Sequence, residues 1–203
     1  MIKTLVLNAS LKHKSDQAPS NTEELAQLVL DNMAKLAEID AEIIRLADFQ
    51  IDIGLGHKES DADQWPEIVE KIKAADVVIF ATPVWWGQRS SLMQRVIERL
   101  DALDEDYLAS DRSALLNKVA GVVVTGTEDG AQQVIASILE VLTFMNFTIP
   151  PQAATYWVGE VGDDPKTERD RRLQSKAAPH MAESTAKSLV YYAQLLKDNP
   201  MEV

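Results

Sequence analysis

The sequence predicts an α/β fold in which one parallel β-sheet of five strands is covered by helices on both faces. Short, continuously apolar runs alternate along the chain with longer segments whose apolar residues recur at helical spacing. Strands without polar alternation are typical of a parallel sheet that is buried on both faces. The 203 residues suffice for one such domain with a full core. The expected strands are residues 2–7, 41–46, 76–81, 119–125 and a segment within 147–158.

Five helices are expected between and after these strands. The first begins near Thr22, and its apolar residues continue at helical spacing as far as Ile39. Pro150 and Pro151 are expected to mark the start of the last strand, because proline cannot donate to a central ladder. The other helices are expected over residues 65–74, 89–103, 129–145 and 179–197, with a polar loop at 47–63, an acidic irregular segment at 104–117 and an exposed excursion at 159–176.

Sheets of this kind bind ligands at one edge. In a doubly wound fold the ligand lies at the carboxyl ends of the strands, beside the point where the strand order reverses. The segments of interest are therefore those that follow the first, third and fourth strands. We expect the whole chain, residues 1–203, to form one domain that carries this site.

Composition excludes several classes of site and partner. The chain has no cysteine, so disulfides, thiolate catalysis and iron–sulfur clusters are excluded. Its net charge of −12 disfavours nucleic acid and anionic lipid as partners, while an acidic face for a basic redox partner stays open. No apolar run approaches the roughly 18 residues that span a bilayer. The first residues, MIKTLVLNAS, have the pattern of a strand rather than of a signal peptide, which predicts a cytoplasmic protein.

The segment after the first strand offers the groups of a phosphate site. Hydroxyls, an amide and the free N–H groups of a helix start suit one phosphate, and the glycine-rich patterns of dinucleotide and triphosphate loops are absent. An ordinary helix cap is the alternative, with Ser20 as N-cap and Glu23 three residues later. Glu23 and Glu24 also disfavour an anion, so both interpretations stay open. The candidate phosphate ligands are Ser10, Ser20, Asn21 and Thr22.

The segment after the third strand, ATPVWWGQ, contains two adjacent tryptophans. Indole rings give a flat apolar surface that suits a planar ring system. Pro83 and Gly87 fix the loop and leave backbone donors and acceptors free for the edge of a ligand. The alternative for either Trp85 or Trp86 is a place in the core or in a subunit interface.

The segment after the fourth strand, TGTEDGA, contains two glycines that allow the backbone to approach a ligand closely. By itself it is a helix-capping loop, with Asp129 as the expected cap. Its position matters more, because it is the third loop expected at the same edge of the sheet. Together the three loops predict a pocket with a place for one phosphate and a flat aromatic end, a combination that FMN matches.

Four stretches of the sequence match a known family: NASLK…SNTEEL, ATPVWWGQRSSLMQRVIERLD, VTGTEDGA and FTIPPQAATYWVGE, within residues 2–160. They closely resemble the flavodoxin-like NAD(P)H-dependent FMN reductases and related small flavoprotein oxidoreductases. The resemblance implies a flavodoxin-like three-layer sandwich around the five-stranded parallel sheet. It implies that Ser10, Ser20, Asn21 and Thr22 hold the FMN phosphate, that Pro83, Val84, Trp85, Trp86 and Gly87 line the isoalloxazine, and that Thr125, Gly126, Glu128, Asp129 and Gly130 meet its pyrimidine edge or ribityl side.

The phosphate loop departs from the tighter S-x-R-x-x-S/G-N-T form of many members. Lys12 stands where an arginine is common, which leaves the role of this cofactor-site residue open. The implied reaction passes a hydride or electrons from NAD(P)H through bound FMN to a small acceptor such as a quinone or a flavin, with no required catalytic side chain. The preference for NADH or NADPH stays open. No metal site is expected, the three histidines are expected at the surface, and a homodimer or homotetramer is implied.

Two other functions share this fold. A flavodoxin-type electron carrier without NAD(P)H oxidation activity matches the acidity of the chain, but the extra loops and the last helix exceed what a carrier needs. A phospho-receiver domain requires an acidic cluster after the first strand and an aspartate after the third. Those places hold Asn8-Ala9-Ser10 and Thr82-Pro83-Val84, so a flavin protein is the preferred interpretation.

Overall fold

The computed structural model describes residues 1–16, 19–162 and 164–202, and a parallel sheet forms its centre. The parallel strands are β1 (Ile2–Asn8), β2 (Ile39–Arg45), β3 (Val77–Trp85), β5 (Val119–Gly126) and β6 (Ala154–Val158). Their order across the sheet is β2-β1-β3-β5-β6. The chain therefore crosses over β1 between β2 and β3, which places the reversal of strand order beside the carboxyl end of β1. The predicted fold class and its five parallel strands are confirmed.

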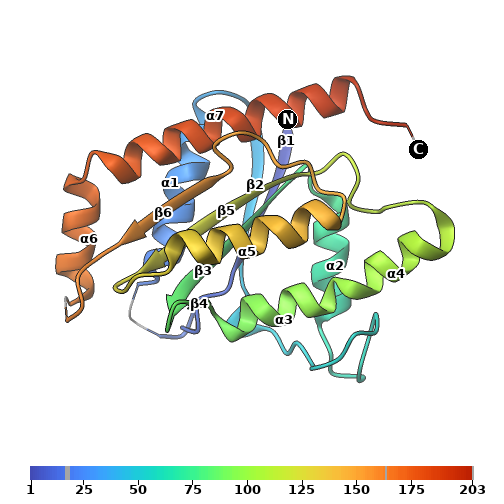
Figure 1. Cartoon of the computed structure of the whole chain (residues 1–203), viewed down its shortest axis with the longest axis horizontal. Coiled ribbons are helices and arrows are strands. Elements are labelled where there is room, and N and C mark those ends of the chain that lie inside the picture. The colour runs from blue at the N-terminus through green and yellow to red at the C-terminus, as the bar shows by residue number, and fades with distance from the viewer. Residues whose placement is uncertain (17–18, 163, 203) are drawn as a thin grey trace.

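Helices cover both faces of this sheet (Figure 1). One face packs against α1 (Asn21–Ala34) and the long α7 (Ala177–Asp198). The other packs against α2 (Trp65–Ala74), α3 (Ser91–Arg99), α4 (Asp101–Ser110) and α5 (Ala131–Phe144). A short 3-10 helix, η1 (Leu46–Asp48), follows β2, and α6 (Pro165–Gln174) lies at the end of the molecule where β6 finishes.

The continuous apolar runs of the strands follow from the two-sided burial. Successive residues of a strand point to opposite faces, so Val78 and Phe80 of β3 enter the core under α2 and α5. Val77 and Ile79 enter the core under α1 and α7. The central strands are therefore mostly apolar, which is the pattern that predicted a parallel sheet, while the edge strand β2 exposes Asp40 and Glu42.

Three of the predicted segments differ from the structure. The first helix ends at Ala34, and Ile39 is already the first residue of β2 rather than part of the helix. Residues 101–110 form α4, although 104–117 was expected to be irregular. Beyond Ala81, β3 continues to Trp85 and pairs with the short antiparallel β4 (Gln88–Arg89), so the expected loop is a β-hairpin.

The segment after β6 was also expected to be an exposed excursion. It contains α6, and two charged residues of this helix, Glu168 and Arg172, are buried. Hydrophobic periodicity gives no signal for a helix whose buried positions carry charges. Of the described helices, none combines the length and the apolar composition needed to cross a membrane.

Candidate flavin site

A cleft of about 290 Å³ opens at the carboxyl ends of β1, β3 and β5. Three of its walls are the loops that the sequence predicted to meet there, and α6 contributes a fourth. All predicted site residues except Gly87, Asp129 and Gly130 line the cleft, together with three residues that were not predicted. Among the described residues, the lining consists of Ser10, Leu11, Lys12, Ser20, Asn21, Thr22, Pro83, Val84, Trp85, Trp86, Thr125, Gly126, Thr127, Glu128 and Glu168.

The first turn of α1 supplies the helix N-terminus of the cleft. Ser20 is the N-cap, and its Oγ accepts a hydrogen bond from the Glu23 N–H at 3.2 Å. The Glu23 carboxylate turns to Asn8, whose Nδ2 lies 2.9 Å from Oε2, rather than completing a capping box. Ser20 therefore caps the helix and lines the cleft at once, so the two interpretations of this segment are compatible.

Arginines neutralise both glutamates of this first turn. Arg45 of β2 donates its Nε to Glu23 Oε2 at 2.9 Å. Arg169 of α6 donates its Nε to Glu24 Oε2 at 3.0 Å, and Arg172 donates to the same oxygen. The acidic turn that disfavoured an anion in the sequence is thus compensated from two distant elements, and the positive end of the helix remains available.

The loop between β1 and α1 is closed by hydrogen bonds of its own. The buried Ser10 follows the strand, and its N–H donates to Asn8 Oδ1 at 3.0 Å. The ammonium of Lys12 donates to the carbonyl of Pro19 at 3.0 Å. Lys12 is the single cationic residue among the described residues that line the cleft. It brings the two ends of the loop together and places one positive charge at its rim.

The hairpin formed by β3 and β4 makes the apolar wall. Its two turn residues, Trp86 and Gly87, have φ angles of 50° and 74°, as a two-residue type I′ turn requires. Trp85 and Trp86 are 51% and 87% exposed, so neither belongs to the core. The N–H of Trp86 donates to the carboxylate of Glu128, which ties the hairpin tip to the loop after β5.

The loop after β5 completes the cleft floor. The hydroxyls of Thr125 and Thr22 lie 2.7 Å apart, and both residues are buried. This contact joins β5 to the first turn of α1. A Cβ atom on Gly126 would lie 3.0 Å from the Cβ of Val84, so the glycine permits a close approach between this loop and β3.

Gly87, Asp129 and Gly130 lie outside the cleft lining. Asp129 is exposed and is not the cap of α5, because the N-cap residue is Gly130, which has no side chain to cap with. Gly130 has a φ of 122°, and a Cβ atom there would lie 2.7 Å from the Cα of Gly87. The two glycines therefore pack the hairpin tip against the loop and shape the wall from behind.

Glu168 lines the cleft, although residues 159–176 were expected to be an exposed excursion. It is 2% exposed, and its carboxylate pairs with Arg172 Nη1 at 3.2 Å. Asp163, which belongs to the same expected excursion, lies outside the described residues. Asp164 is exposed and caps α6, since its Oδ1 accepts from the N–H groups of Lys166 and Thr167 at 3.0 and 3.1 Å.

The environment of Glu168 favours its neutral form. Burial raises the pKa of its carboxyl above the ordinary value, and the nearby Glu24 raises it further. Arg172, Trp157 and Asn21 oppose this shift by stabilising the charged form, but burial outweighs them. A buried carboxyl with a perturbed pKa beside a cleft is typical of a functional site.

The histidines lie elsewhere, at the surface, as predicted. His13 and His57 pair with Asp48 at 3.2 Å and Asp106 at 3.1 Å, and His180 is exposed on α7. Within residues 1–16, 19–162 and 164–202, no group of three His, Asp or Glu side chains is placed to hold a metal ion.

Residues 2–161 match the family described as NADPH-dependent FMN reductase. The chain belongs to this family. It is therefore a flavodoxin-like oxidoreductase that uses FMN and NADPH, and the recognition made from the sequence is confirmed. This result agrees with a cleft that combines a helix N-terminus with an aromatic hairpin.

Individual relatives are similar over most of the chain. The 8-demethyl-8-aminoriboflavin-5'-phosphate synthase of Streptomyces davaonensis is 31% identical, over 98% of this chain and 80% of its own. The FMN-dependent NADPH-azoreductase of Staphylococcus aureus is 27% identical, over 70% of this chain and 73% of its own. Both names refer to flavin chemistry.

Solved structures give the same fold. RosB with bound 8-demethyl-8-formylriboflavin-5'-phosphate aligns with a TM-score of 0.83 at 27% identity, covering 99% of this chain and 82% of that one. An NADH:FMN oxidoreductase in its apo form aligns with a TM-score of 0.66 at 16% identity, covering 98% and 92%. The second likeness supports the fold alone.

Proposed function

We propose that residues 1–203 act as one FMN-binding domain, with the phosphate at the first turn of α1 and the ring against the β3–β4 hairpin and the loop after β5. The residues present suit this ligand. Asn21 Oδ1 is buried without a hydrogen-bond partner in the protein, which is expected where a bound polar ligand completes the contacts. The cleft also offers hydroxyls at one end and two tryptophans at the other.

Each group of residues has a separate task. Ser10, Ser20 and Thr22 would bind the phosphate through hydroxyl and backbone N–H groups, with Lys12 as a nearby charge. Pro83, Val84, Trp85 and Trp86 would form the flat wall for the ring, and Thr125, Gly126 and Glu128 its polar edge. Bound FMN supplies hydride and electron transfer from NAD(P)H to a small acceptor, and the protein binds, orients and shields it.

The observation that carries this proposal is the meeting of the three predicted loops around one cleft. We expect Ser20→Ala to weaken FMN binding about tenfold, because it removes a hydrogen bond to a charged group. Binding of riboflavin, which lacks the phosphate, is expected to stay the same. Fluorescence titration with both flavins measures this difference.

The matched control is Ser15→Ala, because Ser15 is an exposed serine of the same loop and does not line the cleft. It should leave both affinities unchanged. An equal loss of FMN and riboflavin affinity in Ser20→Ala would place the phosphate elsewhere. A wild-type protein that binds neither flavin would contradict the whole proposal.

The electron-carrier alternative is separated from an oxidoreductase by steady-state kinetics. A carrier should oxidise almost no NAD(P)H by itself, whereas an oxidoreductase should turn over with a quinone, a flavin or an azo dye as acceptor. The FMN-dependent NADPH-azoreductase among the similar proteins supports the second outcome. An acceptor screen with both NADH and NADPH identifies the preferred pair.

A second candidate function is modification of the flavin itself. The observation that supports this function is the likeness to RosB, which has a TM-score of 0.83 over 99% of the chain. In this case FMN would be the substrate, and a substituent of its ring would change. Mass spectrometry of the flavin recovered after incubation with amino donors in air distinguishes the two, since a reductase returns FMN of unchanged mass.

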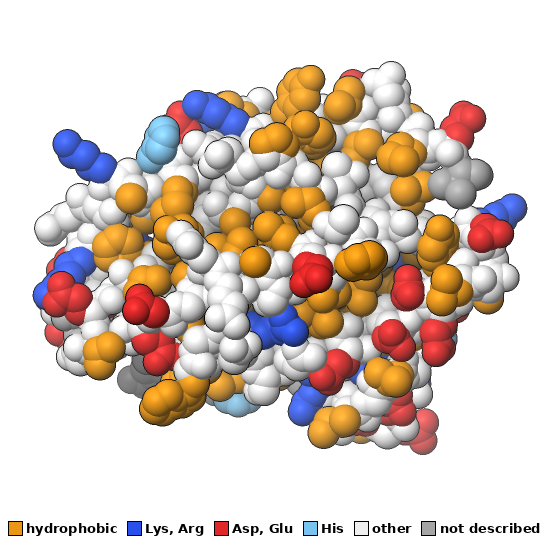
Figure 2. All heavy atoms as spheres, viewed as in Figure 1, with side chains coloured by type: hydrophobic (Ala, Val, Ile, Leu, Met, Phe, Trp, Pro, Cys, Tyr) orange, Lys and Arg blue, Asp and Glu red, His pale blue; other side chains and the backbone are white. Residues whose placement is uncertain are grey.

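We also propose a cytoplasmic homo-oligomer assembled through the face that carries α3 and α5. Figure 2 shows apolar side chains gathered across the middle of this face. α5 has one charged residue, Glu140, in fourteen, and Phe144 at its end is 79% exposed. Light scattering of Phe144→Glu and wild type tests the assignment, and an unchanged mass in the variant would exclude this face.

A further inference from the structure

We propose that Glu168 and Asn21 form a subsite that binds the hydroxyl groups of a polyol chain, such as the ribityl chain of FMN, beside the phosphate position. This inference rests on the proposed binding of FMN in the cleft. It assigns a specificity role to α6, a helix outside the three loops that the sequence indicated. The two residues would select ligands by their hydroxyl groups rather than by their phosphate or ring.

Glu168 reaches the cleft from α6, which follows the edge strand β6 and pairs with the first turn of α1. Its side chain is 3% exposed, and its carboxylate is held by Arg172 at 3.2 and 3.3 Å. A Cβ atom on Gly159 would lie 3.0 Å from Cγ of Glu168, so the backbone after β6 packs directly against this side chain. The carboxylate is thus fixed in place at the cleft wall.

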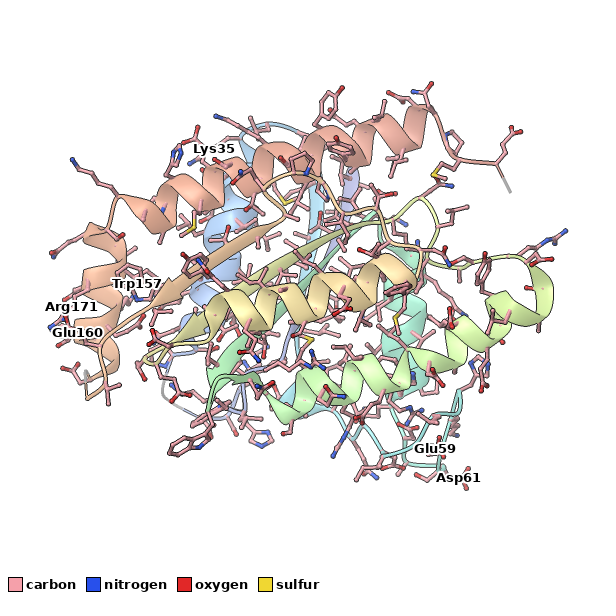
Figure 3. The ribbon with its side chains drawn as sticks, viewed as in Figure 1. Lys35, Glu59, Asp61, Trp157, Glu160 and Arg171 are labelled. Atoms are coloured by element: carbon pink, nitrogen blue, oxygen red, sulfur yellow. The ribbon has the colours of Figure 1, made fainter. Side chains whose placement is uncertain are left out.

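Two neighbours of Glu168 each leave a polar atom without a well-formed partner, one an acceptor and one a donor. Asn21 lies beside the carboxyl and stabilises its charged form, while Asn21 Oδ1 has no partner in the protein. Trp157 of β6 also lies beside it, and its indole N–H makes no well-formed hydrogen bond. Figure 3 shows Trp157 next to α6.

The chemistry of these atoms decides what the subsite can take. The amide oxygen of Asn21 accepts, the indole N–H of Trp157 donates, and the Glu168 carboxyl accepts when charged and also donates when neutral, so the ligand must both donate and accept. Phosphate oxygens at neutral pH only accept and carry negative charge, so they do not match Asn21 Oδ1. Hydroxyl groups both donate and accept, and a short polyol chain carries several of them at close spacing.

The charged groups around the subsite are compatible with an uncharged ligand. Arg172 and Arg169 on α6 and Glu24 on α1 are the charged groups that accompany Glu168 at this place. Both arginines pair with Glu24, and Arg172 also pairs with Glu168. An uncharged polyol therefore fits without adding an unpaired charge to a buried position.

The test compares three flavins with one variant. Glu168→Met removes the acceptor and keeps an unbranched side chain, while Arg172 retains its ion pair with Glu24. We expect the affinity for FMN and for riboflavin to fall about tenfold alike, because both carry the ribityl chain. The affinity for lumiflavin, which has the ring without that chain, is expected to stay the same.

Glu160→Met is the matched control, because Glu160 belongs to the same segment, pairs with Arg171 and does not line the cleft. It should leave all three affinities unchanged. Loss of FMN affinity alone would assign Glu168 to the phosphate, and an equal loss for all three flavins would assign it to the ring or to the fold. Either result overturns the polyol subsite.

A second variant guards against misfolding of the first. Asn21→Leu leaves the Glu168–Arg172 pair intact and removes the orphaned acceptor. We expect the same pattern: the affinity for FMN and riboflavin falls, and the affinity for lumiflavin stays unchanged. Normal riboflavin affinity in this variant contradicts the proposal, whereas a wild-type protein that binds no flavin contradicts the proposed function instead.

Discussion

Two buried ion pairs lie at opposite ends of the molecule, and the carboxylate of each comes from a segment that the sequence presented as irregular. Arg99 and Asp63 join α3 to the segment before α2, where Glu59 and Asp61 are seen in Figure 3. Arg172 and Glu168 lie on α6, the helix beside which Trp157 is labelled in the same view. The pairs have similar burial but different surroundings.

Asp63 has every acceptor position occupied. Its carboxylate accepts Arg99 Nη1 at 2.8 Å and the N–H groups of Glu59 at 3.0 Å and Trp65 at 3.1 Å. Burial would raise the pKa of this carboxyl, yet these hydrogen bonds together lower it below its ordinary value. This carboxylate therefore has no free position at which to accept from a ligand.

Glu168 has one arginine and an open cleft, and burial raises its pKa instead. The difference between the two carboxylates shows how a structural ion pair differs from a candidate binding group. Full backbone satisfaction marks the first, and an acceptor left facing a cleft marks the second.

The largest effect is expected for Asp63→Asn. It leaves the guanidinium of Arg99 buried without a charged partner, which costs about 3–5 kcal/mol in the free energy of unfolding. Urea denaturation measures this loss, and Asp61→Asn, at an exposed aspartate of the same segment, is the control. Flavin affinity of the folded variant should match that of wild type, and a selective loss of affinity would break the distinction drawn here.

Gly130→Ala is expected to cost about 1–3 kcal/mol, because a Cβ atom is strained at this φ and collides with the backbone of Gly87. The hairpin tip must shift, so flavin affinity should fall as well. Thermal unfolding and flavin titration measure the two effects. Gly162→Ala, at a positive φ with open space around it, is the control and should affect stability alone.

Arg45→Met tests whether neutralisation of Glu23 is needed for the FMN phosphate to bind at the first turn of α1. It leaves Glu23 uncompensated in the first turn of α1, and we expect FMN affinity to fall about tenfold with riboflavin affinity unchanged. Titration at low and high salt should show a smaller loss at high salt, because salt screens the exposed charge. Equal losses for both flavins would contradict this explanation.

The smallest effect is expected in the pH dependence of stability. A raised pKa means that the folded state holds the Glu168 proton more tightly than the unfolded state, so this group favours folding less as pH rises above about 4.5. The free energy of unfolding of Glu168→Met relative to wild type should therefore increase between about pH 4 and pH 7.

The pH dependence of stability should have the opposite sign for Asp63. Its lowered pKa adds to the free energy of unfolding above about pH 4, and this contribution is lost as pH falls further. Urea titrations of both variants across this range provide the measurement. Parallel pH profiles in the two variants would remove the distinction between the two carboxylates.

Much of this architecture could be predicted from the sequence. The buried strands were recognisable because both of their faces need apolar residues, and the three site loops followed from the strand order. The site residues after β1 and β5 carry hydroxyls or glycines that have direct physical uses there.

The two helices that the sequence did not predict, α4 and α6, have little hydrophobic periodicity. α4 buries only Ala102 and Leu103 among its residues, so a helix could not be separated from an acidic loop. α6 buries charges, but Asp164-Pro165 is a helix start, and Glu168 and Arg172 stand at i, i+4. Those two signals together could have revealed the helix and the residue that reaches the cleft.

From the contacts of Glu24 we expect that the anion-binding turn is completed late in folding. The arginines that neutralise it lie 145 and 148 residues further along the chain, so the anion-binding turn is incomplete until the last quarter of the protein has docked. Contacts so distant in sequence form late, because the intervening chain must first be arranged. Quenching of flavin fluorescence during refolding should therefore lag behind the recovery of helical circular dichroism. Flavin binding would then report when α6 docks against the first turn of α1.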